Sequence, residues 1–260
     1  MFDLQTWLLA LEALMVFGVA GWLLSLVRKD VSIVDSMWSL MFGIAAVVYL
    51  LGTESGPRAT LVMLLAAIWA VRLAVYITWR NWGEGEDYRY QRIRANNEPN
   101  FAFKSIYIVF GLQAALAWII SLPLLAAMSG TRPIGFIDLA AVVLWVIGFV
   151  FEALGDLQLA QFIANPDNRV KVLQSGVWRV TRNPNYFVYA CIWWAFFLFA
   201  LSAGGWWSVV SPLLMTFLLL KVSGVAMLEK DIGERRPDYA DYIARTNAFF
   251  PGLPKNGASS

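Results

Sequence analysis

Residues 175–186 read Ser-Gly-Val-Trp-Arg-Val-Thr-Arg-Asn-Pro-Asn-Tyr, and an apolar run over residues 187–202 follows them directly. The first part is polar and turn-prone, and Pro184 suits the first turn of a helix, where the missing N–H of proline costs nothing. Free backbone N–H groups at a helix start, with Arg179 and Arg182 beside them, favour an anion such as phosphate. The alternative is a loop at a membrane surface whose arginines only anchor it.

The composition of the chain narrows the choice of protein class. Of its 260 residues, 59% are hydrophobic and 15% charged, and the mean hydropathy of +0.60 is typical of a multi-pass membrane protein. A net charge of +2 gives no reason to expect nucleic acid as a partner. The chain has no histidine, which argues against a metal site and against histidine-dependent triads. Acid–base chemistry must therefore come from Asp, Glu, Tyr, Lys or water.

Seven apolar stretches are long enough, or nearly so, to cross about 30 Å of hydrocarbon as helices. They cover residues 4–27, 31–52, 58–80, 105–128, 136–163, 187–202 and 206–228. The first lacks the basic start of a cleavable signal, so it is predicted to be an anchor with its N-terminus outside. The sequence therefore predicts an all-α integral membrane protein, one multi-pass domain over residues 1–260, with seven transmembrane helices and a cytoplasmic C-terminus.

The distribution of basic residues supports this topology. Sixteen of the 20 Lys and Arg residues fall in the segments predicted to be cytoplasmic, and only Arg58 and Arg132 fall in the outer ones. The inner segments are also the longer ones. Residues 81–104 form a mixed-charge loop that contains the run Trp-Gly-Glu-Gly-Glu-Asp-Tyr-Arg-Tyr. We therefore expect an active site that faces the cytoplasm.

Ionisable residues inside the predicted spans are the next candidates for a functional site. A charge at the centre of a bilayer costs about 2.5–3.5 kcal/mol on insertion scales, so such residues are candidates by default. Five lie in the cytoplasmic halves of their spans: Asp35, Arg72, Glu152, Asp156 and Lys221. Glu152 and Asp156 are four residues apart and share one helix face. Simple ion pairs between helices, such as Asp35 with Arg72, are the alternative. Glu12, in the middle of the first span, receives no role.

Several segments of this chain resemble the steroid 5α-reductase family. Residues 176–186, followed by Trp193 and Trp194, are similar to its C-terminal signature, and residues 221–224, 228–230, 236–242, 245–246 and 250–251 continue the likeness. The resemblance is strongest to bacterial members, which implies a bacterial inner membrane. It also implies a seven-helix enzyme that binds NADPH without a Rossmann domain. Such an enzyme transfers hydride to a carbon–carbon double bond conjugated to a ketone, in an apolar, steroid-like substrate that enters from the bilayer.

The resemblance, together with the anion-favouring turn, implies a cofactor-binding half over approximately residues 150–251. Asp156 and Asn185 match family positions that hold the cofactor, and Arg80 and Asn81 are assigned to its nicotinamide end. The full set of predicted cofactor-binding residues is Arg80, Asn81, Glu152, Asp156, Arg179, Arg182, Asn185, Tyr186, Trp193, Lys230, Arg236, Tyr239 and Arg245.

The catalytic positions of the family are matched less completely in this chain than the cofactor-binding positions. The resemblance implies an acid on the second helix and a tyrosine on the third, which together polarise the ketone of the substrate. The acid corresponds to Asp35, but the position of the tyrosine is occupied by Trp69. Tyr76 and Tyr88 are the substitute candidates. Glu54 falls in an outer loop and is rejected.

A second family keeps another function open. Isoprenylcysteine carboxyl methyltransferases, which use S-adenosylmethionine, resemble the same region through an Arg-x-Pro-x-Tyr element. In them the residue between Arg and Pro is typically histidine, whereas this chain has Asn183. Lys230 also suits a phosphate-bearing cofactor better than a sulfonium. We therefore rank the reductase first, the methyltransferase second, and a transporter or membrane scaffold third.

Overall fold

The computed structural model describes residues 2–54, 56–168, 171–222 and 239–254, which are helical or irregular and include no strand. Within these residues, six helices are long and apolar enough to cross a membrane: Leu4–Arg28, Ile33–Gly52, Pro57–Arg80, Phe101–Met128, Phe136–Ala164 and Pro184–Ser202. The prediction of an all-helical, multi-pass membrane protein is therefore confirmed. A shorter apolar helix, Trp206–Val222, begins the seventh predicted span. Residues 223–228 of that span lie outside the described residues, so seven spans stay a prediction.

The first three helices begin and end where the sequence supplies end signals. Helix α1 (Leu4–Arg28) is capped by Asp3, whose carboxylate accepts hydrogen bonds from the backbone N–H and hydroxyl of Thr6 at 3.1 and 2.6 Å. Helix α2 runs over Ile33–Gly52. Helix α3 (Pro57–Arg80) has proline at its first position, where no intrahelical donor is needed.

Residues 81–104, interpreted from the sequence as a loop, contain two helices. Helix α4 (Tyr88–Asn97) is capped by Asp87, and α5 covers Phe101–Ser105. The chain then continues through a π-helical stretch, η1 (Ile106–Gly111), into α6 (Leu112–Ile120) and α7 (Leu122–Met128). The fourth span therefore begins at Phe101 rather than at residue 105.

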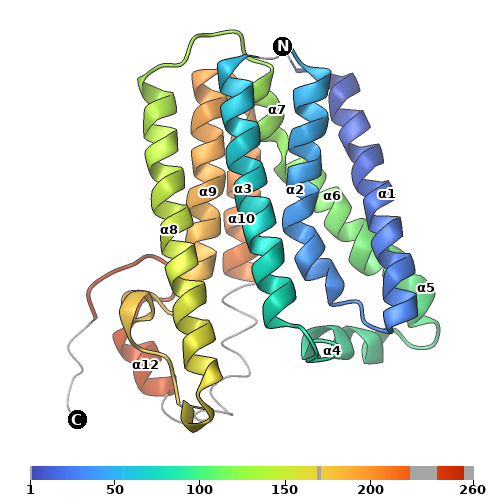
Figure 1. Ribbon diagram of the computed structural model, residues 1–260, viewed down its shortest axis with the longest axis vertical. Helices are drawn as coiled ribbons and strands as arrows, with labels where there is room; N and C mark the ends of the chain where they lie inside the picture. The colour runs from blue at the N-terminus through green and yellow to red at the C-terminus, as the bar shows by residue number, and fades with distance from the viewer. Residues whose placement is uncertain (1, 55, 169–170, 223–238, 255–260) are drawn as a thin grey trace. The chain divides into compact units, whose positions relative to one another are not determined.

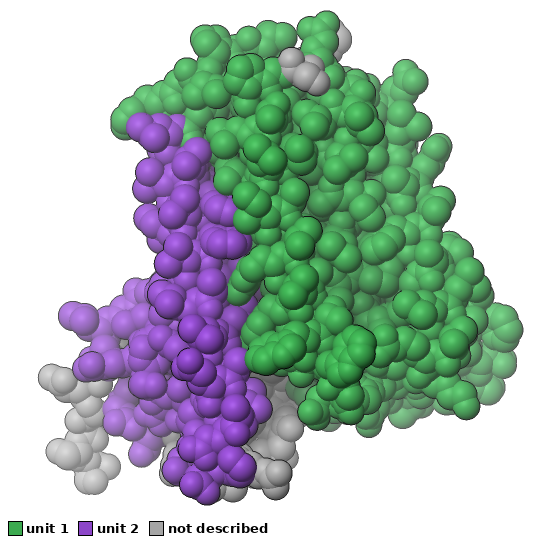
Figure 2. Space-filling model, viewed as in Figure 1, with its two compact units in different colours: residues 1–138, 196–211 green, residues 139–195, 212–260 purple. Residues whose placement is uncertain are grey.

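The remaining elements begin with the long helix α8 (Phe136–Ala164) and α9 (Pro184–Ser202), which starts at Pro184 as predicted. The others are short: η2 (Pro166–Asn168), η3 (Gly176–Arg179), η4 (Trp206–Val209), α10 (Val210–Phe217), η5 (Leu218–Val222) and α12 (Tyr239–Arg245). The chain forms two compact units, coloured in Figure 2: unit 1 (residues 1–138 and 196–211) and unit 2 (residues 139–195 and 212–260).

Unit 1 is built on α1, α2 and α3, which lie side by side in Figure 1. Helix α2 is the central one, because it packs against both others and against α6 and α7. Two buried hydrogen bonds join it to its neighbours: the Ser39 hydroxyl donates to the Ala70 carbonyl at 2.9 Å, and Tyr49 and Ser121 share a hydroxyl contact of 2.6 Å. Helix α4 lies crosswise at the end of unit 1 opposite the N-terminus in Figure 1, and we call this the α4 end. The other end, where the N-terminus lies, is called the Phe2 end.

A buried ion pair closes the Phe2 end of unit 1. The Arg58 guanidinium donates to both carboxylate oxygens of Asp138, at 2.7 and 2.9 Å, and also to the carbonyls of Arg132 and Pro133. Arg58 and Asp138 are 3% and 1% exposed. The Ser202 hydroxyl donates to Asp138 at 2.6 Å, so both carboxylate oxygens are satisfied. This network joins α3, the first turn of α8 and the end of α9.

Candidate functional site

The first polar cluster lies at the α4 end of unit 1 around Asp35, in the first turn of α2. One oxygen of the Asp35 carboxylate accepts a hydrogen bond from the Tyr90 hydroxyl at 2.6 Å, and the other accepts one from Arg89, also at 2.6 Å. We call these three residues the Asp35 cluster. The sequence suggested Arg72 as an ion-pair partner of Asp35, and the ion pair in the structure is with Arg89 of α4.

The turn before α4 positions Arg89 and Tyr90. Its backbone takes positive φ at Gly83 and Gly85, a conformation that glycine adopts without strain. The Ser32 hydroxyl accepts from the backbone N–H of Asp87 at 2.7 Å, and Glu86 accepts from the backbone N–H of Val31 at 3.0 Å. These contacts hold the start of α4 against the residues that lead into α2.

The two partners of Asp35 have shifted proton affinities. Burial raises the pKa of the Tyr90 phenol, and the Asp35 carboxylate raises that pKa further, so the phenol stays neutral at ordinary pH. Burial alone would lower the pKa of Arg89, but the charges of Asp35 and Asp87 raise it above its usual value. Tyr90 is also anchored by packing, because its ring belongs to a buried cluster with Val31, Val34, Met37, Phe101, Val109 and Phe110. Asp35 therefore has a neutral donor and a cation beside it.

Tyr76 and Tyr88, the tyrosines that the sequence predicted to be catalytic, lie at the α4 end but outside the Asp35 cluster. Tyr76 is half-buried on α3 between two arginines, with the guanidinium carbons of Arg72 and Arg80 each 5.7 Å from its ring centroid. Arg80 is exposed and donates to the side-chain oxygen of Asn81 at 3.1 Å. Tyr88 is 40% exposed at the start of α4. Arg80, Asn81 and Tyr76 are thus brought together around the end of α3.

The second polar cluster belongs to unit 2 and consists of Glu152, Asp156 and Asn185. Glu152 and Asp156 are buried one turn apart on α8, with 1% and 3% exposure. The Asn185 amide donates to Asp156 at 3.2 Å, and its side-chain oxygen is buried with no hydrogen-bond partner among the described residues. A Cβ on Gly155 would lie 3.2 Å from that oxygen, so glycine here allows the start of α9 to approach α8 closely. We call this group the Asn185 cluster.

The turn before α9 is docked on α8 by its backbone. Gly176 has φ of +59°, and a Cβ on it would lie 2.3 Å from the Gln158 amide nitrogen. Gln158 in turn accepts from the backbone N–H of Val177 at 3.0 Å. The Trp178 indole donates to the Gly155 carbonyl at 3.1 Å. The stretch around residues 175–186 is therefore held against the face of α8 that carries Asp156.

The rest of that stretch binds the C-terminal segment. The Thr181 hydroxyl donates to the Phe249 carbonyl at 3.0 Å, and the Asn183 amide donates to the Ala248 carbonyl at 2.9 Å. Arg182 is 8% exposed, and its guanidinium donates to the carbonyls of Ile243 and Thr246. These contacts give Arg182 a structural role in holding residues 243–249, whatever ligand the loop binds.

The two other described arginines predicted in unit 2 are exposed. Arg179 ends η3, and Arg245 ends α12, where its Nε atom donates to the Asp241 carbonyl at 3.3 Å. The two segments that carry them are joined, because the side-chain hydroxyl of Tyr242 donates to the backbone carbonyl of Trp178. Arg179 and Arg245 therefore project from neighbouring segments and, unlike Arg182, are available to an anion in solution.

The remaining predicted residues are aromatic or lie outside the described residues. Tyr239 is buried on α12, with its ring centroid 5.7 Å from that of Tyr242. Trp193 is fully buried and Tyr186 half-buried on α9. Lys230 and Arg236 lie outside the residues that the structure describes.

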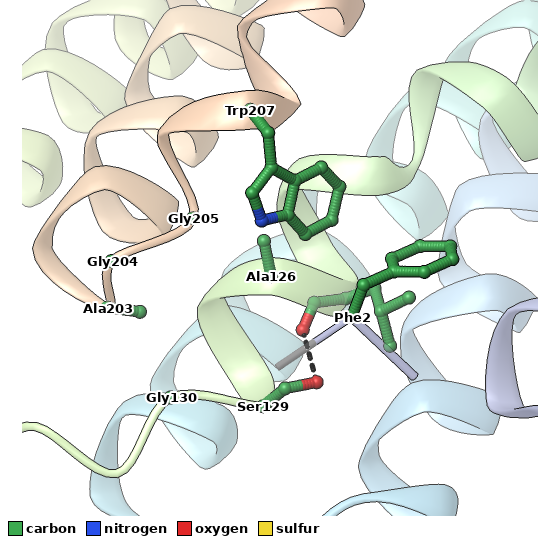
Figure 3. A pocket seen from close by; sticks show the side chains of 9 residues that line it. Phe2, Ala126, Ser129, Gly130, Ala203, Gly204, Gly205 and Trp207 are labelled. Atoms are coloured by element: carbon green, nitrogen blue, oxygen red, sulfur yellow. Dashed lines mark hydrogen bonds between the residues drawn. The ribbon is translucent and has the colours of Figure 1, made fainter. Parts of the chain in front are cut away.

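A small pocket at the Phe2 end of unit 1 offers no alternative site. Figure 3 shows its lining, in which Phe2 and Trp207 pack edge to face at 5.2 Å above small residues such as Ala126 and Gly205. Its volume of about 50 Å³ admits a few water molecules at most. Its lining offers two polar side chains, the indole of Trp207 and the hydroxyl of Ser129, which donates to the Leu125 carbonyl at 2.8 Å. Among the described residues there is also no group of three or more side chains that could hold a metal ion.

Sequence comparisons identify relatives of the chain but no solved structure. The family described as "Protein of unknown function (DUF1295)" matches residues 21–246. A protein of Schizosaccharomyces pombe, described as uncharacterized, is 26% identical over 277 aligned positions, which cover 92% of this chain and 77% of the yeast protein. No solved structure matches the chain.

Proposed function

This chain belongs to the DUF1295 family, which is associated with steroid 5α-reductase-like membrane proteins, and on that premise we propose that it is an NADPH-dependent membrane reductase. Its substrate is an apolar, steroid-like ketone with a conjugated carbon–carbon double bond, which enters from the bilayer. The single observation that carries the chemical part of the proposal is the 2.6 Å hydrogen bond between the Tyr90 hydroxyl and Asp35.

The side chains of unit 2 fit a nucleotide that carries phosphates. The exposed Arg179 and Arg245 supply cations for phosphate groups, and arginine suits them through paired N–H donors. Asp156 and Glu152 supply buried acceptors for hydroxyl or amide groups. The buried side-chain oxygen of Asn185, which has no hydrogen-bond partner among the described residues, is a further acceptor. In this assignment Arg182 acts indirectly, by holding the segment that ends in Arg245.

The Asp35 cluster supplies the proton in this proposal. When bound, NADPH would supply a hydride to the carbon–carbon double bond of the substrate, which would leave negative charge on the ketone oxygen. The Tyr90 hydroxyl, which donates to Asp35 in the free protein, turns to donate to that oxygen and then passes its proton to it. Asp35 orients the hydroxyl before the substrate binds, and Arg89, whose guanidinium carbon lies 5.6 Å from the Tyr90 ring centroid, stabilises the phenolate. This places the phenol on α4, whereas the family resemblance expects it on the third helix.

Methyl transfer from S-adenosylmethionine is the second candidate function. The observation that favours it is the buried carboxyl pair of Glu152 and Asp156, which would also attract a sulfonium cation. The exposed arginines favour NADPH instead, because a sulfonium cofactor has no phosphate for them to bind. Competition between the two cofactors for the purified protein decides between these functions.

The proposal includes an orientation in the membrane. We assign the protein to the bacterial inner membrane because its sequence resembles bacterial members of the steroid 5α-reductase family most strongly. We place the N-terminus outside and the active site toward the cytoplasm because the sixteen-to-two asymmetry of basic residues follows the positive-inside rule. A reporter fused to the C-terminus should be active in the cytoplasm, and one fused to the N-terminus should be exported. Reporters of both termini on the same side would contradict the assignment.

Turnover in proteoliposomes tests the proposed reaction. Vesicles that contain the protein and a steroid 3-oxo-Δ4 ketone should oxidise NADPH, and the product should contain two more hydrogen atoms than the substrate. Tyr90→Phe keeps the buried ring but removes the donor, so turnover should fall by about 10²–10⁴-fold while NADPH still binds. Tyr107→Phe, at a tyrosine that is 61% exposed on η1, is the matched control and should keep wild-type turnover. Full turnover by folded Tyr90→Phe would remove Tyr90 from the mechanism.

A further inference from the structure

Helix α1 carries an apolar stripe that no described part of the protein covers. Its exposed residues recur at heptad spacing, with Gln5, Glu12 and Val19 each seven residues apart. Leu8, Val16 and Leu23 lie beside them on the same face, and they are 42%, 70% and 53% exposed. Ala10, Leu14, Gly18 and Gly21 face the other way and are buried in unit 1. The stripe is therefore the side of α1 that faces away from the rest of unit 1.

Glu12 is out of place on this stripe. It lies eight residues after Leu4, or about 12 Å along the helix at 1.5 Å per residue, and well inside a 25-residue apolar span. It is exposed and makes no hydrogen bond or ion pair with the described residues. Leu4, Gln5, Leu8 and Leu9 line a shallow hollow with Glu12 on the surface of α1. Ionisable side chains at such positions almost always face a bundle interior or a partner.

Lipid alone does not account for a glutamate here. A carboxyl group in hydrocarbon loses its charge or acquires a hydrogen-bonded partner, because leaving it unpaired costs several kcal/mol. Snorkelling to the interface is typical of the long stems of Lys and Arg, and the side chain of Glu12 is shorter than either. The position calls for a polar group supplied by another helix within the bilayer.

We propose that this stripe is the interface of a parallel homodimer, in which Glu12 pairs with the Glu12 of a second copy of this chain. A two-fold axis along the membrane normal brings each residue against its own copy at the same depth. In the proposed dimer one Glu12 carboxyl donates a hydrogen bond to the other, so the two copies of Glu12 satisfy each other. Two copies of Gln5 do the same one heptad away, and Leu8, Val16 and Val19 pack around them.

A second copy of the chain fits the stripe because the stripe complements itself. Both polar positions are able to donate and to accept, and neither requires a cation from a different protein. The heptad spacing of Gln5, Glu12 and Val19 matches the seam of a two-helix coiled coil, which keeps one face toward its partner along its whole length. Glycine-based packing is not available to this interface, because Gly18 and Gly21 are used inside unit 1.

Disulfide trapping in membranes tests the geometry of the dimer. In a Cys191→Ala background, which removes the single native cysteine, Val19→Cys should give a covalent dimer on mild oxidation. Leu24→Cys is the matched control, because Leu24 is 50% exposed but lies about a third of a turn off the stripe. Efficient trapping through Leu24→Cys, or no trapping through Val19→Cys, would overturn the proposed interface.

The contribution of Glu12 is measured by the equilibrium between monomer and dimer in vesicles, followed by energy transfer between labelled copies. Glu12→Leu should weaken the dimer about three- to thirtyfold, since a hydrogen bond between membrane helices contributes about 0.6–2 kcal/mol. Glu12→Gln keeps a group that donates and accepts, so it should stay close to wild type. Unchanged or tighter dimerisation by Glu12→Leu would refute the role of Glu12. A wild-type protein that stays monomeric, or pairs only with a different membrane protein, would refute the homodimer.

Discussion

Replacing Arg182 by alanine separates a structural arginine from one that binds a ligand. The Arg182 guanidinium is buried and donates to the carbonyls of Ile243 and Thr246, so Arg182→Ala leaves both acceptors without their donor. Hydrogen bonds to a charged group contribute about 1.5–3 kcal/mol each, and entering water recovers part of the loss. We therefore expect the free energy of unfolding to fall by about 3 kcal/mol.

The assay follows unfolding in detergent together with hydrogen exchange of the C-terminal segment. Amide exchange at residues 246–252 should accelerate in Arg182→Ala, because these residues lose their anchor to the loop before α9. Arg182→Lys, which retains a cation and one donor direction, should recover part of the stability. Arg179→Ala is the matched control: Arg179 is exposed, so its loss should change the free energy of unfolding by less than about 0.5 kcal/mol.

The affinity for NADPH is also compared between Arg182→Ala and Arg179→Ala. Both variants should bind NADPH more weakly, but only Arg182→Ala should also lose stability and exchange protection. A variant Arg182→Ala that kept wild-type stability and exchange while it lost NADPH binding would refute the structural role of Arg182. Arg182 would then be a direct contact of the phosphate, as the turn signal in the sequence first indicates.

Three further predictions concern stability. Gly176→Ala should lower the free energy of unfolding by about 2–3 kcal/mol, because alanine is strained at positive φ and its Cβ would displace the amide of Gln158. Gly135→Ala is the control in the same thermal unfolding assay and should change the free energy of unfolding little, because nothing lies within 4 Å of a Cβ at that position. Burial alone would raise the pKa of the Asp87 carboxyl, but the hydrogen bonds and charge of its partner Arg89 lower it. The stabilisation of the fold by this carboxylate is therefore present above about pH 4 and is lost as the pH falls through the folded pKa. Between about pH 5 and pH 3 the unfolding temperature of Asp87→Asn should fall less steeply than that of the wild type, and parallel curves for the two proteins would contradict this. Asp138→Asn should lower the free energy of unfolding by about 3–5 kcal/mol by leaving the buried Arg58 unpaired, and a loss below 1 kcal/mol would show that this ion pair is dispensable.

The helices were predictable because their signals are local. An apolar run of about 20 residues specifies a span by length alone, and Pro57 and Pro184 sit at the first positions of their helices, as proline prefers. Helix α4 was missed because its residues are mostly polar and its ten residues show little hydrophobic periodicity. Its stability comes from the Asp87 cap and from the burial of Tyr90, which depends on tertiary packing.

The contacts of the two clusters depend on residues far apart in the sequence. Tyr90 and Asp35 are 55 residues apart, and neither spacing nor composition indicates that the hydroxyl of one reaches the carboxylate of the other. The sequence did single out Asp156 and Asn185, and the structure brings them within 3.2 Å, although their binding role stays a prediction. Arg182 shows the limit of motif reasoning, since an arginine that binds backbone carbonyls looks the same in a sequence as one that binds phosphate.

The identity of the bound nucleotide tests the central claim most directly. Protein purified in mild detergent without added cofactor is denatured, and the small molecules released are identified by mass spectrometry. We predict NADPH or NADP⁺ in wild-type samples, and less of it in Asn185→Ala, which removes the amide that donates to Asp156. Release of S-adenosylmethionine or S-adenosylhomocysteine instead, with no NADP(H) binding on titration, would contradict the reductase assignment.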